Sequence, residues 1–177
     1  SDGPGTTIID GDGSEWGLSC SYAGTNETRI EGFTITNCYG EWPKGGGMSI
    51  EYSSPMISNC IFDSNSANGN GGGILCRYDS YPVITGCRFI NNSTSSDSYP
   101  GGGIISVYNS HPIISDTLFC GNFPDQISGS WTDNGGTCIS VTCDDSDGDG
   151  WPDQCGTIAD GVHHVPDEFP TIQQAIN

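Results

Sequence analysis

Short runs in which apolar and polar residues alternate recur along the chain, separated by segments rich in glycine, asparagine, serine and proline. Alternation with a period of two predicts β-strands, and the separating residues disfavour helices. One set of runs ends on tyrosines spaced 30, 26 and 30 residues apart: Tyr22, Tyr52, Tyr78 and Tyr108. A second set carries a large apolar residue at spacings of 27, 27 and 30: Ile35, Phe62, Phe89 and Phe119.

A repeat of this length, made of short strands, is typical of a solenoid in which each repeat forms one coil and stacked coils share a core. Equivalent residues on neighbouring coils then lie about 4.8 Å apart, so that like side chains form ladders. We expect a ladder of the four tyrosines and another of Asn65, Asn92 and Asn122. Three glycine triplets are expected at tight corners, where a Cβ would clash or φ is positive: residues 45–47, 71–73 and 101–103.

Several of these segments are similar to a known family. The octapeptide Ile-Glu-Gly-Phe-Thr-Ile-Thr-Asn at 30–37, the glycine triplets and the Ser-Xaa-Pro-Xaa-Ile-Ser-Asn-Cys runs resemble right-handed parallel β-helix proteins of the pectate-lyase-like class. The resemblance covers residues 6 to 136. It implies an all-β, right-handed parallel β-helix solenoid of about five coils over residues 1–136. The class includes polysaccharide lyases and hydrolases as well as adhesins and surface proteins, so the resemblance implies a fold and not an activity.

Charge and cysteine content narrow the class of protein. The 22 acidic residues against four basic ones give a formal charge of −18, which excludes a nucleic-acid binder because phosphate contacts need Lys and Arg. We expect no membrane span, because no run of about 18 apolar residues is present. Nine cysteines indicate an oxidising compartment, and therefore a secreted or cell-surface protein. Cys60 and Cys87 share one inward column and Cys20 and Cys76 another, where we expect core packing and not disulfides.

An acidic connector, residues 137–161, follows the predicted coils. Four aspartates and a glycine have the spacing of positions 1, 3, 5, 9 and 6 of a calcium loop: Asp145, Asp147, Asp149, Asp153 and Gly150. The acid of position 12 is missing, and the segment resembles the short calcium loops of thrombospondin type 3 repeats more than an EF-hand. We expect Ca²⁺ to stiffen this connector; the alternative is a solvated acidic linker. Cys143 and Cys155 bracket the segment and are candidates for a disulfide that closes it.

The terminal segment, residues 162–177, resembles the opening of the same β-helix family, where a short amphipathic helix covers the first coil. We expect a short helix beginning near Pro170 and apolar residues available for assembly: Val165, Phe169, Ile172 and Ile176. The chain then begins within one β-helix and ends on the start of another. It would be a fragment of a tandem array, one repeat of a polymer, or a unit whose tail caps the next molecule, and all three imply head-to-tail continuity. The alternative is a monomer whose tail folds back or has no fixed structure.

The outward columns of the predicted coils give little support for catalysis. No column stacks two or three carboxylates, as a calcium-dependent lyase or a paired-acid hydrolase would require. Glu51 and Arg77 are expected to form a surface ion pair of small effect. Outward apolar residues such as Leu75, Ile105 and Leu118 should be covered by loops or form a protein contact. Glycosylation sequons, meaningful only if the source glycosylates, begin at Asn26, Asn91 and Asn92.

Two functions of different classes fit these features. The first is a non-catalytic extracellular structural protein, whose β-helix units join head to tail into a fibre, filament or surface array stiffened by calcium. The second is a carbohydrate-binding or carbohydrate-cleaving β-helix, with Trp42, Trp16 or Trp131 as stacking platforms. The missing acid stack favours the first. Its main partner is another copy of the chain, with glycans as further partners.

Overall fold

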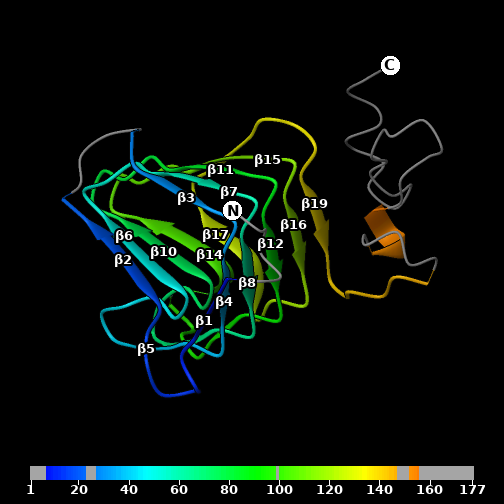
Figure 1. Cartoon of the computed structure of the whole chain (residues 1–177), viewed down its shortest axis with the longest axis horizontal. Helices are drawn as coiled ribbons and strands as arrows, with labels where there is room; N and C mark the ends of the chain where they lie inside the picture. Colours follow the sequence, from blue (N-terminus) through cyan, green and yellow to red (C-terminus); the bar gives the residue numbers. More distant parts are fainter. Residues whose placement is uncertain (1–6, 23–26, 99, 147–151, 156–177) are drawn as a thin grey trace.

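The computed structural model describes residues 7–22, 27–98, 100–146 and 152–155, so the expected terminal helix and its assembly residues lie outside the described ranges. The described chain forms a parallel β-helix with four sheets, which confirms the predicted fold (Figure 1), although it contains about four coils and not about five. Sheet A contains β1 (Ile8–Asp10), β4 (Thr34–Thr36), β8 (Ile61–Asp63), β12 (Arg88–Ile90), β16 (Leu118–Cys120) and β19 (Cys138–Ser140). Sheet B contains β2 (Leu18–Ser21), β6 (Met48–Glu51), β10 (Ile74–Arg77), β14 (Gly101–Val107) and β17 (Asp125–Gly129).

The two remaining sheets complete the wall. Sheet C contains β3 (Arg29–Glu31), β7 (Met56–Ser58), β11 (Val83–Thr85), β15 (Ile113–Ser115) and β18 (Thr132–Asp133). Sheet D contains β5 (Tyr39–Glu41), β9 (Ser66–Asn68) and β13 (Ser93–Thr94). A short 3-10 helix, η1 (Asp153–Cys155), follows the last strand. Within the described ranges, no helix is long and apolar enough to cross a bilayer.

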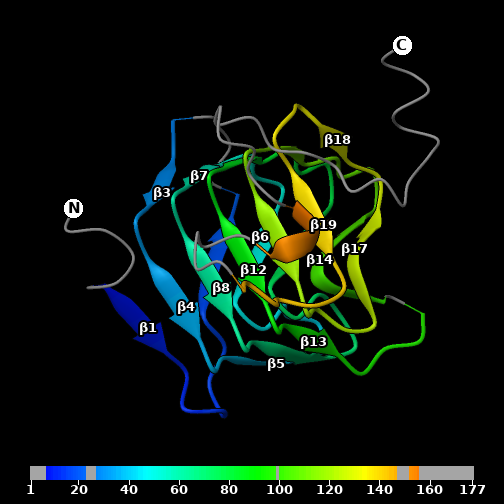
Figure 2. The same cartoon turned by 90° about the vertical axis from the view of Figure 1, so that its right-hand side faces the viewer.

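The coils stack in sequence order along one axis. Three coils, β4 to β7, β8 to β11 and β12 to β15, place a strand in every sheet, and the described residues of β1–β3 and β16–β18 add a partial coil at each end. Figure 1 shows the coils following one another from the blue end to the yellow end. Figure 2 shows the sheets surrounding a single interior. Side chains at one position of successive coils are therefore held one above the other.

The interior is a column of apolar side chains that repeats with the coils. Phe62, Phe89 and Phe119 are fully buried, with ring centroids 4.8 and 4.7 Å apart, and Ile35 continues their column on the preceding coil. Further columns of fully buried aliphatic residues come from sheets B and C: Met48, Ile74 and Ile104, then Ile57, Ile84 and Ile114. Because each coil needs few such residues, a hydrophobic content of 33 % is enough for a continuous core.

The predicted tyrosine ladder forms the corner between sheets B and C. Adjacent rings of Tyr22, Tyr52, Tyr78 and Tyr108 are stacked with centroids 5.0 Å apart. All four residues have positive φ, between 48° and 59°, a conformation that is rare for bulky residues. Each coil thus makes the same left-handed turn at this corner, and the stacked rings run along the outside of the shaft.

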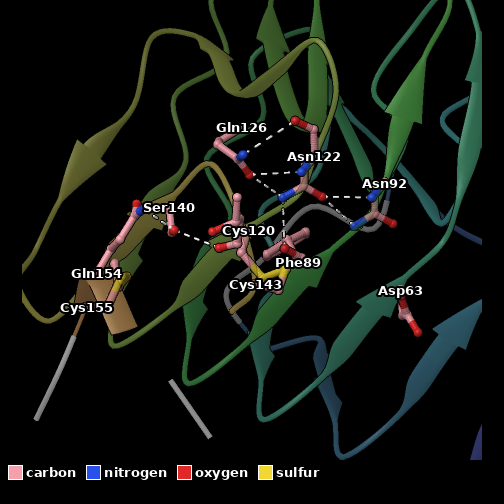
Figure 3. Close-up of a disulfide and its surroundings, with 12 residues drawn as sticks. Asp63, Phe89, Asn92, Cys120, Asn122, Gln126, Ser140, Cys143, Gln154 and Cys155 are labelled. Atoms are coloured by element: carbon pink, nitrogen blue, oxygen red, sulfur yellow. Dashed lines mark hydrogen bonds between the residues drawn. A yellow bond between two sulfur atoms is a disulfide. The ribbon is translucent and has the colours of Figure 1, made fainter. Parts of the chain in front are cut away.

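The predicted asparagine ladder is also present, and it is fully buried at Asn65 and Asn92. The Nδ2 of Asn65 donates to Oδ1 of Asn92, and the Nδ2 of Asn92 donates to Oδ1 of Asn122, each over 2.9 Å. Each of these amides also donates to a backbone carbonyl of the preceding coil, as Asn92 does to Phe62 over 2.8 Å. Gln126, which the periodicity does not predict, ends the ladder by accepting from Asn122 (Figure 3).

The glycine triplets permit close approach between coils. A Cβ on Gly47 would lie 2.7 Å from the carbonyl oxygen of Gly73, which is closer than real Cβ contacts. None of the nine triplet residues has positive φ. Glycine is therefore required at these corners because a Cβ would clash, and not because the backbone is left-handed. The triplet loops also lie against outward side chains: a Cβ on Gly45 would be 2.9 Å from Leu75, and one on Gly71 would be 2.9 Å from Ile105. These loops bury both residues, as predicted.

Candidate functional site: an anchored acidic connector and an aromatic pocket

The connector after β19 packs on the outer face of sheet A. Leu118 and Cys120 point outward from β16, and Cys138 points outward from β19, yet all three are buried together with Cys155. Ile90 and Cys143 pack against this second apolar cluster. The expectation that a loop covers Leu118 is therefore confirmed. Sheet A also extends through β19 into the segment that was expected to be connector.

Two disulfides fix the connector to this face, and they differ from the predicted pair. Cys143 bonds to Cys120, with the Cα atoms 5.2 Å apart (Figure 3). Cys155 bonds to Cys138, with the Cα atoms 5.8 Å apart. The predicted Cys143–Cys155 bridge is therefore wrong. The register of β16 with β19 places both wall cysteines on the covered face, where each reaches one end of the acidic segment. The positions of Cys143 and Cys155 on either side of the acidic segment do not show which cysteines of sheet A this segment contacts.

Polar contacts close the described ends of the acidic segment. The Asp153 carboxylate accepts from the Ser146 backbone N–H at 2.7 Å and from the Ser146 hydroxyl at 2.9 Å. The Asp153 N–H donates to the Asp144 carbonyl at 2.7 Å, so the two ends of the segment meet. Of the expected calcium ligands, Asp145 and Asp153 are in the described ranges, whereas Asp147 and Asp149 lie outside them. The calcium loop stays a prediction.

The five remaining cysteines are free and buried: Cys20, Cys38, Cys60, Cys76 and Cys87. Burial raises the pKa of the Cys76 and Cys38 thiols. A hydrogen bond with the Cys60 thiol, followed by burial, raises the pKa of Cys87. The same hydrogen bond with Cys87 lowers the pKa of the Cys60 thiol to about 7. All five thiols are buried and act as small core residues, as predicted for the two inward columns.

A thiol count tests this assignment. We expect the chain, denatured without a reductant, to titrate five thiols with a thiol-specific reagent, because four of the nine cysteines are in disulfides. The native protein should react at none of them within the same time, because all five side chains are buried. Peptide mapping under non-reducing conditions should recover the Cys120–Cys143 and Cys138–Cys155 links. A Cys143–Cys155 cross-link would contradict the anchored connector.

The sequons differ in accessibility. Asn91 is exposed at a corner, whereas the neighbouring Asn92 is fully buried and its amide is used in the asparagine ladder. The Asn92 amide is therefore not accessible to a glycan in the folded coil, whereas Asn91 stays a candidate. Asn26 lies outside the described residues.

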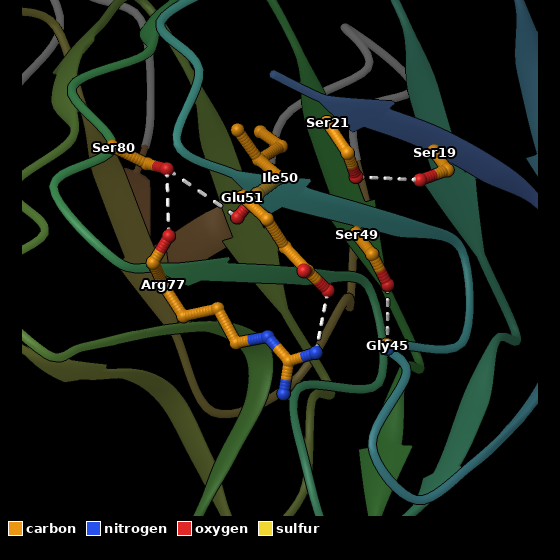
Figure 4. Close-up of polar contacts among 8 residues, drawn as sticks. All are labelled: Ser19, Ser21, Gly45, Ser49, Ile50, Glu51, Arg77 and Ser80. Carbon is orange, nitrogen blue, oxygen red and sulfur yellow. Dashed lines mark hydrogen bonds and ion pairs between the residues drawn. The ribbon is translucent and has the colours of Figure 1, made fainter.

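The outer columns contain the expected ion pair. Arg77 Nη2 donates to Glu51 Oε1 on the adjacent coil (Figure 4). The two side chains are 12 % and 20 % exposed, so the pair is more buried than the predicted surface pair and less screened by solvent. In the registers of the described strands, no two carboxylates occupy adjacent positions of one column.

A pocket lies beside the tyrosine ladder. Its volume is about 220 Å³, and its lining includes Trp42, Asn70, Arg77, Tyr78 and Tyr108. The Trp42 indole is 71 % exposed, whereas Asn70 is only 6 % exposed. Sequence reasoning named Trp42 as a platform but missed Asn70, because Asn70 lies in a loop whose length differs from coil to coil.

The other two candidate platforms are already occupied by contacts within the chain. The Lys44 ammonium lies 3.6 Å from the centre of the Trp16 ring. Trp131 packs against the core. Of these three tryptophans, Trp42 presents the most open ring to a ligand.

Comparison with known proteins agrees with this architecture. Residues 2–147 match the family described as the right-handed β-helix region, which is more than half of the chain. The protein therefore belongs to the right-handed β-helix family. No curated protein and no solved structure gave a match.

Proposed function

We propose that the chain is a non-catalytic extracellular structural module, in which calcium stiffens the acidic connector and β-helix units join head to tail. The observation that supports this most is the double anchoring of the connector. Cys143 and Cys155 attach both ends of an aspartate-rich segment to the shaft wall, where a flexible linker would need no such attachment. Disulfides of this kind persist in oxidising compartments, which favours an extracellular location.

The construction of the shaft supports a mechanical role. Phenylalanine, tyrosine and asparagine ladders run across successive coils, so a load along the axis would be shared by many equivalent contacts. The inward apolar column reaches both terminal strands of sheet A, where Ile9 of β1 is only partly buried and Ile139 of β19 is 43 % exposed. Exposed apolar residues at the two ends of a stack suit contact between one unit and the next.

Calcium removal tests the connector. At a free calcium concentration about ten times Kd, binding to the native state is expected to add about 1.4 kcal/mol to the free energy of unfolding. The thermal midpoint should therefore rise with calcium and fall with a chelator. Asp147→Asn with Asp149→Asn should abolish this difference, because these carboxylates supply ligand oxygens.

Asp144→Asn is the matched control, since Asp144 lies outside the calcium spacing and its described bond uses the backbone carbonyl. It should keep the calcium response. If the thermal midpoint does not change in chelator and a calcium titration gives no heat of binding, the segment does not bind calcium and is a solvated linker.

A further inference from the structure

Two residues that line the pocket beside the tyrosine ladder have hydrogen-bond donors that the chain does not satisfy. Asn70 Nδ2 and Arg77 Nε are both buried, and neither has a partner in the protein. Buried donors without partners are costly, and native structures rarely keep them without a reason. Both residues line the same pocket of about 220 Å³. Both of these atoms are N–H donors, so the complementary ligand presents acceptor oxygens.

The walls and the charge of the pocket restrict the ligand further. Trp42, Pro43, Tyr78 and Tyr108 provide flat, largely apolar surfaces, and the Trp42 ring is 71 % exposed. Arg77 is paired with Glu51, so the charge inside the pocket is balanced and an ion there gains little. The whole chain carries a formal charge of −18, which repels anions and attracts cations at longer range. A suitable ligand has rings, carbonyl oxygens and no negative charge.

We propose that this pocket binds a proline-rich peptide segment flanked by Lys or Arg. A polyproline II segment makes no internal hydrogen bonds, so its carbonyl oxygens are free to accept from Asn70 and Arg77. Its proline rings pack well on aromatic side chains, and aromatic-lined grooves are the usual sites for such segments. Flanking basic residues would remain outside the pocket, where the negative field of the protein attracts them. The binding site is independent of calcium and of the connector.

The test is a titration of the full chain with a synthetic twelve-residue peptide, a proline run with two lysines at each end, followed by calorimetry. We expect saturable binding in the presence of a chelator. Trp42→Ala should weaken it at least about tenfold, because an aromatic anchor in an interface typically dominates the affinity. Asn70→Leu should weaken it about fivefold or more without lowering the thermal midpoint, because the Nδ2 group has no partner to lose in the free protein.

Tyr22→Ala is the control variant, since Tyr22 is 77 % exposed at the far end of the tyrosine ladder and does not line the pocket. Its affinity for the peptide should equal that of the unsubstituted chain. A peptide with the same lysines and a Gly-Ser run in place of proline should not bind. Equal binding of that peptide would show simple charge attraction and overturn the proposal. Absence of saturable binding, an unchanged affinity in Trp42→Ala, or binding of a neutral oligosaccharide in place of the peptide would also overturn it.

Discussion

Phe89→Ala is expected to lower the free energy of unfolding by about 3–5 kcal/mol, the usual cost of removing a fully buried aromatic ring. The Phe89 ring lies between those of Phe62 and Phe119, with centroids 4.8 and 4.7 Å away, and it has no exposed surface. The register of sheet A holds the coils on both sides in place, so the cavity cannot collapse easily. Urea denaturation followed by circular dichroism measures the change.

Phe123→Ala is the matched control, because the Phe123 side chain is 69 % exposed. It should change the free energy of unfolding by no more than about 0.5 kcal/mol. A loss below about 1 kcal/mol for Phe89→Ala would mean that the coils are not packed around a continuous phenylalanine column.

Asn92→Leu is expected to destabilise the protein by about 3–4 kcal/mol, even though leucine has a similar volume. The substitution leaves three buried groups of the preceding coil without partners, at about 1–3 kcal/mol for each group. The Asn65 backbone N–H and Nδ2 lose their acceptor, and the Phe62 carbonyl loses its donor. Equilibrium unfolding gives the size of the loss, and amide hydrogen exchange at Asn65 should become faster.

Asn68→Leu provides the comparison for the ladder. Asn68 is an exposed residue of sheet D, and it accepts a single hydrogen bond, at 3.3 Å, from Ser95. Its substitution should cost no more than about 0.5 kcal/mol. Equal losses at the two positions would contradict the assignment of the ladder as a buried, fully paired network.

The repeating parts of the fold were predictable because equivalent residues recur in each coil at a regular spacing. Tyr22 to Tyr108, Phe62 to Phe119 and Asn65 to Asn122 recur at the coil period, and in parallel register a shared period means direct contact. The buried cysteines Cys60 and Cys87 were placed correctly for the same reason.

The non-repeating parts of the fold could not be predicted from the coil period. The pairing of Cys143 with Cys120 depends on where the connector meets the outer face of sheet A, and no period carries that information. Gln126 replaces an asparagine at the end of the ladder, where the repeat itself changes. The unsatisfied amide of Asn70 depends on the packing of one loop, so its role in the pocket becomes visible only in three dimensions.

We propose that this chain is a calcium-dependent structural unit that assembles end to end. Negative-stain electron microscopy of the protein over a series of concentrations, with calcium and with a chelator, tests it most directly. We expect rods that join along the β-helix axis into filaments in calcium and separate in chelator. Isolated short rods at every concentration, with and without calcium, would contradict it.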